Sequence, residues 1–200
     1  MATKPFRKSI VTPVGVAVYP HVTPGSPDSK FGDPVYKCNL RLEGEDATQF
    51  IAKIEEMKVQ AMEHLGVKDL IVPIVPALDD DKNVIPGAFD VKTKAKAFFK
   101  QADGSMVENH LTVVDAKKQP YDVSNGAIWG GSKLKLALNV GAVSTSIYSG
   151  LMLRINAVQV IDLVTGGQGG ANAFDKEDGF TAEPKPVMTV AEGEDESIDF

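Results

Sequence analysis

The sequence predicts a mainly β domain, a small closed or partly closed β-barrel with one or two helices and long loops, followed by an acidic tail. Several segments of modest length alternate apolar and polar residues, as strands with one buried face do. Between the second and the later strands, one segment repeats apolar residues at helical spacing. The last ten residues, AEGEDESIDF, contain too little apolar surface to offset the entropy of ordering them, so we expect a disordered tail.

The first strand is predicted over about 9–19, after a flexible basic arm over residues 1–8. In this strand Tyr19 shares a face with Gly15 and Ala17, small neighbours that would leave its ring open. A loop rich in Pro, Gly, Ser and Asp follows over 20–34. The second strand, over 35–43, has an apolar inner face that consists of Tyr36, Cys38, Leu40 and Leu42.

One helix is predicted to follow, and either Asp46 or Thr48 can cap its start while Gly66 ends it. Its apolar positions at helical spacing are Phe50, Ile51, Ile54, Met57, Ala61, Met62 and Leu65. We expect this amphipathic helix to cover one side or end of the sheet. Three prolines in the next segment, 67–87, predict an irregular connection.

The later strands are predicted over 89–100, near 107–114, over 132–140 and over 144–164, the last bending near Gly150. Asp103-Gly104 indicates a turn, and 116–131 is a polar loop that contains the single Trp129. The inward positions of the strand over 132–140 are Leu134, Leu136, Leu138 and Val140. We therefore expect a barrel domain over 9–165 and a glycine-rich hinge with the acidic tail over 166–200.

Charge is unevenly distributed along the 200 residues. The chain has 21 Lys and Arg against 27 Asp and Glu, for a net charge of −6, and residues 175–200 alone carry net −7. The body is therefore close to neutral, at net +1 over 1–174. A single cysteine excludes an internal disulfide and fits a reducing compartment. Without a long apolar segment or an apolar leader, we expect a cytoplasmic protein that does not associate with membranes.

Residues suited to catalysis or metal binding are few. The three histidines lie in unrelated segments, and none has a metal-ligand partner three or four positions away. Asp79-Asp80-Asp81 resembles the start of a calcium loop, but Val84 occupies the position that requires glycine. The glycines over 166–170 precede no predicted helix that could aim amides at a phosphate. We predict no enzymatic activity, no metal and no cofactor.

Cations and aromatic residues on several predicted strands indicate a single-stranded nucleic acid, which needs cations along its phosphates and aromatic faces for its bases. One face of the segment 91–99 contains Lys92, Lys94, Lys96 and Phe98. A solvated face with lysines that protect a sheet edge is the alternative interpretation. The further candidates, on other strands and loops, are Tyr19, Lys37, Arg41, Trp129, Lys133, Lys135, Tyr148 and Arg154.

Three stretches together are similar to one family. They are Tyr19-Pro20 with the loop to Lys30-Phe31 and Val35-Tyr36-Lys37, then GGSKLK over 130–135, and LRINAVQVIDL over 153–163. Over about 9–164 the chain resembles the single-stranded DNA-binding proteins of tailed phages. The resemblance implies an oligonucleotide/oligosaccharide-binding (OB) barrel of five strands and a role in phage DNA replication, recombination and repair. It also adds Phe31 to the candidate DNA contacts.

The resemblance gives the tail a role as well, because phage and bacterial single-strand binders often end in acids and a terminal Phe that replication partners recognise. The matching residues are Glu194, Asp195, Glu196, Ile198, Asp199 and Phe200. The expected partners are single-stranded DNA, replication proteins such as a polymerase or a helicase/primase, and, as one option, a second copy of the chain. If the chain is phage-encoded, the compartment is the cytoplasm of the host bacterium.

We therefore expect a protein that coats and protects single-stranded DNA without sequence preference, with a tail that recruits partners and modulates DNA binding. Two alternatives stay open at this point. A structural phage barrel, such as a capsid or tail accessory protein, would show no salt-dependent DNA binding. A nuclease would need a carboxylate cluster for its metal, and Asp79 to Asp81 is the one candidate.

Overall fold

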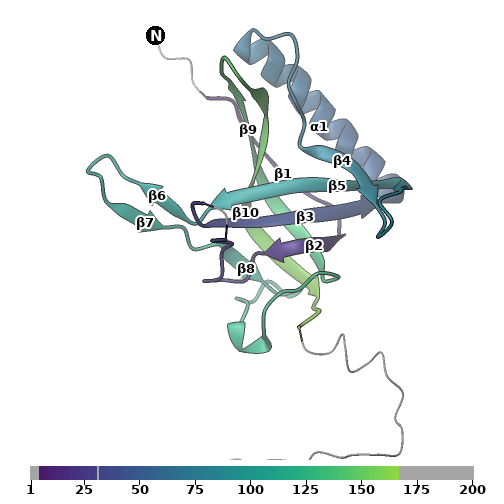
Figure 1. Cartoon of the computed structure of the whole chain (residues 1–200), viewed down its shortest axis with the longest axis vertical. Helices are drawn as coiled ribbons and strands as arrows, with labels where there is room; N and C mark the ends of the chain where they lie inside the picture. The colour runs from purple at the N-terminus through teal and green to yellow at the C-terminus, as the bar shows by residue number, and fades with distance from the viewer. Residues whose placement is uncertain (1–4, 31, 167–200) are drawn as a thin grey trace, which may run out of the picture. The chain divides into compact units, whose positions relative to one another are not determined.

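The computed structural model describes residues 5–30 and 32–166, and its main sheet closes into a five-stranded barrel (Figure 1). The strands of the ring, in spatial order, are β2 (Gly15–His21), β3 (Val35–Glu43), β5 (Val84–Lys96), β10 (Ser149–Asp162) and β9 (Lys133–Ser144). Neighbours in the ring are antiparallel except β5 and β10, which are parallel. The predicted OB-like barrel is confirmed.

Shorter strands extend this ring. β1 (Arg7–Val11) pairs with β9, β4 (Ile74–Leu78) pairs with β5, and β8 (Thr112–Val114) pairs with β10. β6 (Phe98–Lys100) and β7 (Met106–Glu108) form a separate hairpin that projects from the barrel (Figure 1). A 3-10 helix, η1 (Val123–Asn125), lies in the connection between β8 and β9.

The inner faces of the barrel strands form the core. The residues predicted to face inward on β3 and β9 are all buried: Tyr36, Cys38, Leu40, Leu42, Leu134, Leu136, Leu138 and Val140. Because side chains alternate along a strand, the intervening residues lie on the outer surface of the barrel. Lys37 and Arg154 are among them, which brings several candidate DNA contacts to the outside of the ring.

Helix α1 (Gly44–Leu65) packs against β3, β5 and β9 and buries Phe50, Ile54 and Ala61, as its apolar periodicity predicts. The predicted caps were wrong, because the helix begins at Gly44, directly after β3. The Thr48 hydroxyl lies inside the helix, four residues after its start, and donates to the Gly44 carbonyl. The other end is as predicted, since Gly66 adopts the left-handed conformation with φ 68°.

The strand predicted over 9–19 is interrupted. Pro13 lies in the break between β1 and β2, where its missing N–H interrupts the ladder. Arg7 and Lys8, which the sequence placed in a flexible arm, belong to β1, and the neighbouring Phe6 is buried with its ring 5.9 Å from that of His64.

The segment 67–87 is more regular than predicted. It contains β4, an edge strand that tolerates Pro76 opposite Phe89 of β5. The turn from β4 to β5 is closed by Asp79, whose two carboxylate oxygens accept hydrogen bonds from Asn83 at 2.7 and 3.2 Å. This is the geometry of a hairpin turn rather than of a calcium loop.

The strands predicted over 89–100 and 107–114 are each divided in two. β5 ends at Lys96, and β6 begins after Ala97, whose N–H donates to the Pro34 carbonyl at 3.0 Å. The strand expected near 107–114 is likewise two short strands, β7 and β8. No helix in the described part of the chain is long and apolar enough to cross a membrane.

Candidate nucleic-acid interface

Three cations on three neighbouring strands lie side by side on the outside of the barrel. The antiparallel register of β3 and β5 puts Lys37 next to Lys94, and the parallel register of β5 and β10 puts Lys94 next to Arg154. Adjacent strands are about 4.8 Å apart, so these side chains leave the backbone along one short line. Lys92 and Lys96 extend this cluster along β5. We call the five residues the basic face: Lys37, Lys92, Lys94, Lys96 and Arg154.

The basic face is poorly compensated by acids. Like charges directly opposite each other weaken a strand pair, so such an arrangement works against the stability of the sheet. Within the described residues, Lys37 is the one member held in an ion pair, and its partner is Asp28. Arg154 lies within 3.6 Å of the Met152 sulfur. Uncompensated clustering of this kind attracts polyanions.

Asp28 was not predicted from the sequence, which offers only a Ser-Pro-Asp-Ser turn as a signal. Its carboxylate accepts from the Lys37 ammonium and from the Lys30 N–H at 3.0 Å. These two hydrogen bonds, that of Lys37 first, lower the pKa of Asp28 below its usual value. Asp28 is also fixed through its backbone, which exchanges two hydrogen bonds with Val35. At neutral pH the Asp28 carboxylate is therefore charged and paired with the Lys37 ammonium.

Arg41, further along β3, is held by the fold itself. Its Nε and Nη2 donate to the two oxygens of Asp90 at 2.9 and 3.2 Å, and Nη2 also donates to the Leu78 carbonyl at 3.0 Å. The hydrogen bonds to Asp90 raise the pKa of Arg41. Its role as a DNA contact stays a prediction. To contact a phosphate, the guanidinium would have to bind it either beside Asp90 and Leu78 or in their place.

The Tyr19 side chain is exposed at an irregularity in β2. The register of β2 with β3 shifts between Val18 and His21, and Tyr19 has φ 49°, a conformation unusual for a residue other than glycine. The side chain is 78% exposed. The predicted reason for this exposure was wrong, because Gly15 and Ala17 are buried and do not share a face with the Tyr19 ring.

Trp129 lies beyond the same end of β2. Hydrogen bonds from Ala17 N–H to the Ser132 carbonyl (2.8 Å) and from Gly131 N–H to the Ala17 carbonyl (2.9 Å) continue the β2–β9 ladder toward it. The ring is about half exposed and packs over Gly166, where any side chain would collide with it. Tyr19 and Trp129 thus present two aromatic surfaces on the β2 side of β3.

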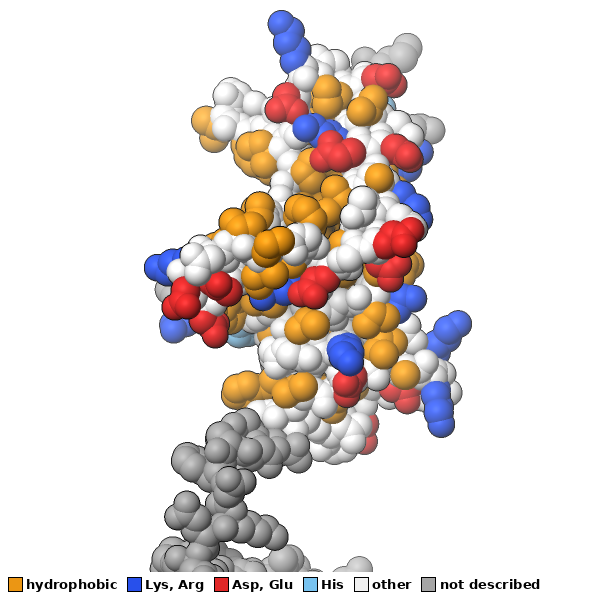
Figure 2. Space-filling model, turned by 90° about the vertical axis from the view of Figure 1, so that its right-hand side faces the viewer, with side chains coloured by type: hydrophobic (Ala, Val, Ile, Leu, Met, Phe, Trp, Pro, Cys, Tyr) orange, Lys and Arg blue, Asp and Glu red, His pale blue; other side chains and the backbone are white. Residues whose placement is uncertain are grey.

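Lys133 and Lys135 lie apart from the basic face. Both are on β9. In the ring, β10 lies between β9 and β5, and β2 lies between β9 and β3. Lys133 lies 3.8 Å from Asp162, and Lys135 lines a shallow hollow beside Asp46 of α1. On the side of the molecule that carries α1, acidic and basic side chains are interspersed (Figure 2). The structure therefore does not join these two lysines to the three-strand cluster.

Two further aromatic candidates have different surroundings. Tyr148 is in the turn from β9 to β10, and its ring covers Gly150, so it is packed against its own hairpin. Phe98 belongs to the projecting hairpin, because the bend at Ala97 separates it from the face of β5 that carries Lys96. Phe31 and the tail residues lie outside the described residues: Glu194, Asp195, Glu196, Ile198, Asp199 and Phe200.

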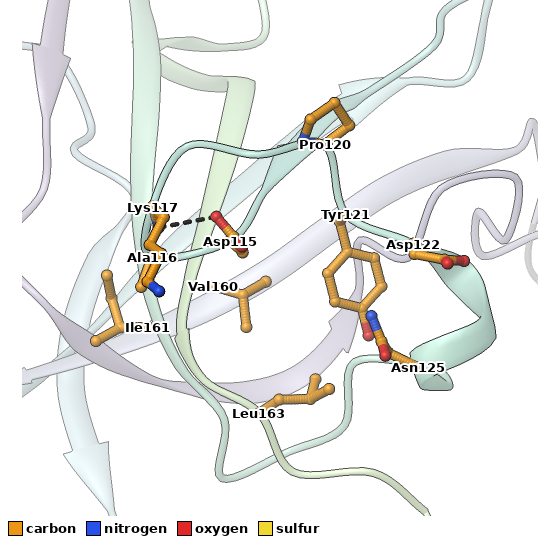
Figure 3. Close-up of a pocket in the computed structure, with 10 residues that line it drawn as sticks. All are labelled: Asp115, Ala116, Lys117, Pro120, Tyr121, Asp122, Asn125, Val160, Ile161 and Leu163. Atoms are coloured by element: carbon orange, nitrogen blue, oxygen red, sulfur yellow. Dashed lines mark hydrogen bonds between the residues drawn. The ribbon is translucent and has the colours of Figure 1, made fainter.

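A pocket of about 390 Å³ lies between the end of β10 and the connection that follows β8 (Figure 3). Figure 3 shows Val160 and Leu163 beside the ring of Tyr121. The pocket is also lined by two carboxylates, Asp115 and Asp122. The Asp115 carboxylate accepts from the Lys117 N–H at 2.8 Å, and Lys117 is the one cation among the lining residues, so two acids outnumber one cation and the lining does not favour a phosphate.

The described residues contain no group of three or more His, Cys, Asp or Glu side chains placed to hold a metal ion. Asp79, the first of the three acids considered for a metal, uses its carboxylate to close the β4–β5 turn.

Comparison with known proteins gives the fold a precedent. Neither a protein-family model nor a curated protein sequence matches the chain. Among solved structures, gp2.5, a single-stranded DNA-binding protein encoded by bacteriophage T7, is 23% identical, with a TM-score of 0.61 over 89% of this chain and 100% of that chain.

A second precedent comes from bacteriophage Enc34. Its single-stranded DNA-binding protein in complex with single-stranded DNA is 14% identical, with a TM-score of 0.56 over 77% of this chain and 86% of that chain. A C-terminally truncated form of the Enc34 protein gives a TM-score of 0.58 at 14% identity, over 77% and 85%. The described barrel thus has the fold of the single-stranded DNA-binding proteins of these two phages.

Proposed function

We propose that the chain binds single-stranded DNA on the basic face with little sequence preference. The observation that carries this proposal is the alignment of Lys37, Lys94 and Arg154 across three strands of an OB-like barrel. OB barrels bind oligonucleotides on the face of their second and third strands, which are β3 and β5 here. Cations that contact phosphates recognise the backbone and not the sequence.

The proposed mechanism combines these cations with stacking. Phosphates lie along the basic face, and unpaired bases stack on the exposed rings of Tyr19 and Trp129. Each neutralised phosphate contributes about −0.7 to the slope of log K against log salt, and each stacked base contributes about 1–3 kcal/mol. One barrel of this kind covers roughly 4–16 nucleotides. Binding is therefore salt-sensitive and selective for strands whose bases are free to stack.

The acidic tail is proposed to compete with DNA. Residues 175–200 carry net −7, whereas residues 1–174 carry net +1. The last described residue, Gly166, lies against the ring of Trp129, and the tail follows it in the sequence. A tethered polyanion acts at high effective concentration and weakens binding of an external one. DNA that displaces the tail leaves Phe200 and its acids free for a replication protein, such as a polymerase or a helicase/primase.

In this role the protein coats and protects single strands during phage DNA replication, recombination and repair in the cytoplasm of the host. A second copy of the chain is a further proposed partner. The fold precedents from T7 and Enc34 support the DNA-binding part of the proposal, because both neighbours are described as single-stranded DNA-binding proteins.

The test is fluorescence anisotropy of a labelled oligo-dT and of a duplex of equal length, across salt concentrations, for the full chain and a chain that ends at Val190. We expect preference for oligo-dT, a steep salt dependence and tighter binding after truncation. Absence of both preference and salt dependence would refute DNA binding and favour a structural barrel. Equal affinity of the two chains would refute the competing role of the tail alone.

A further inference from the structure

The β6–β7 hairpin exposes large apolar side chains away from the barrel core. The exposed fractions are 37% for Phe98, 49% for Phe99, 63% for Met106 and 41% for Val107. The hairpin projects from the barrel (Figure 1), and its strands form a sheet of their own. A two-stranded hairpin has little stability by itself, and clustered apolar groups on such an element indicate a binding surface.

The two faces of the hairpin each present one aromatic ring. The register pairs Phe99 with Val107 and Lys100 with Met106. The third pair is Phe98 with Glu108. Because side chains alternate, Phe99 and Val107 lie on one face, and Phe98, Lys100, Met106 and Glu108 lie on the other. The face of Phe98 therefore carries one cation, Lys100, and one acid, Glu108, whereas the face of Phe99 carries neither.

The base of the hairpin is fixed to the end of the basic face. Asn109 donates from its backbone N–H to the Ala97 carbonyl at 2.7 Å and from Nδ2 to the Lys96 carbonyl at 2.8 Å. The Ala97 N–H in turn donates to the Pro34 carbonyl. The rings at 98 and 99 are thus held two and three residues beyond Lys96.

We propose that this hairpin is a stacking arm, on which bases of the DNA that runs past Lys96 pack against Phe98 and Phe99. This inference rests on the proposed binding of single-stranded DNA. A nucleic acid is favoured over a protein partner because the hairpin follows directly in the chain on β5, the strand that carries Lys92, Lys94 and Lys96. Aromatic rings interleaved with cations suit a chain of phosphates with free bases.

The experiment compares the full chain with the double variant F98A/F99A, with oligo-dT anisotropy across salt as the readout. Loss of stacking predicts about tenfold or greater weakening. The salt slope is expected to stay unchanged, because no cation is removed. The control is Val59→Ala on the surface of α1, where the wild-type side chain is 53% exposed. Circular dichroism and thermal unfolding verify that both variants are folded.

A second readout does not depend on substitution. Oligo-dT that carries 5-iodouracil is irradiated in complex with the full chain, and cross-linked peptides are identified by mass spectrometry. Cross-links within 97–110 support the stacking arm. Wild-type affinity of F98A/F99A without cross-links in that segment would overturn it, and altered self-association of the same variant would then assign the hairpin to a second copy. Failure of the unmodified chain to bind oligo-dT would overturn the proposed function as well.

Discussion

Lys37 of β3 and Lys94 of β5 stand opposite each other in the antiparallel register, so two ammonium groups rise from neighbouring positions of one sheet face. Arg154 of β10 flanks Lys94 on its other side. An arrangement that opposes folding in this way has a natural explanation if the cations bind a polyanion. Removal of Lys94, which is in no ion pair with another described residue, should therefore weaken binding without lowering stability.

Substitution Lys94→Gln is expected to weaken oligo-dT binding and to reduce the magnitude of the salt slope by about 0.7, the contribution of one phosphate. The free energy of unfolding should stay the same or rise by up to about 0.5 kcal/mol, because a like-charge contact is removed. Anisotropy titrations and urea unfolding measure the two quantities. Lys53→Gln, on the exposed surface of α1, is the matched control. An unchanged slope for Lys94→Gln would remove Lys94 from the site.

Substitution Asp28→Asn is expected to strengthen DNA binding and steepen its salt dependence, because it releases Lys37 from its carboxylate partner. The pKa of Asp28 is lowered, so the wild-type carboxylate is charged at all pH values well above 4 and becomes protonated only below that range. The difference between wild type and variant should therefore be constant between about pH 6 and 8. Anisotropy over this pH interval checks it, and a weaker-binding variant would contradict the masking of Lys37.

Tyr19 allows binding to be separated from folding. Its left-handed backbone is unfavourable for tyrosine by about 1–3 kcal/mol and natural for glycine, so Tyr19→Gly should leave the free energy of unfolding unchanged or slightly higher. The same variant should weaken oligo-dT binding by roughly tenfold through loss of a stacked base. Tyr19→Phe, which keeps the ring, should bind like wild type. Equal binding of all three proteins would exclude Tyr19 as a stacking surface.

Arg41 is expected to affect stability more than binding. Arg41→Lys loses the bidentate contact with Asp90 and should lower the free energy of unfolding by about 1 kcal/mol. If the guanidinium stays with Asp90 in the complex, Arg41→Ala leaves the salt slope of oligo-dT binding unchanged. A slope smaller by about 0.7 in Arg41→Ala would instead make Arg41 a phosphate contact, as the sequence pattern suggests.

The Cys38 thiol should react slowly with thiol reagents in the folded protein. Burial raises the pKa of its thiol to about 12, so almost no thiolate exists at pH 8. Reaction with a disulfide reagent is expected to be slow in buffer and fast in denaturing guanidinium chloride. In the unfolded chain the thiol ionises near pH 9, and in the folded chain only near pH 12. Its contribution therefore makes the free energy of unfolding fall as pH rises above about 9.

Much of the barrel could be predicted because its strands have simple alternation. The pattern of Tyr36, Cys38, Leu40 and Leu42 gives both the extent of β3 and its buried face. The end of β5 could not be predicted, because it depends on a hydrogen bond between Ala97 and Pro34, more than sixty positions apart in the chain. Alternation reports which face of a strand is buried, and it carries no information about distant partners.

The candidate site could likewise be predicted within single strands but not between them. Lys92, Lys94 and Lys96 share a face by sequence alone, and the structure adds Lys37 and Arg154 through strand register. Lys133 and Lys135 have the same local pattern as the β5 lysines but lie on β9. The ion pair of Arg41 with Asp90 and that of Lys37 with Asp28 are contacts between segments that local patterns do not relate.

The parallel pairing of β5 with β10 at Lys94 and Arg154 closes the ring, so the barrel has a seam at which two cations repel each other. A phosphate bound between the two cations would attract both of them and so hold β5 and β10 together. Ligand binding and the integrity of the barrel are then linked, since whatever binds only the closed ring also stabilises it. Bound DNA should accordingly slow amide hydrogen exchange along β5 and β10. The exchange rate of these two strands would then indicate whether DNA is bound.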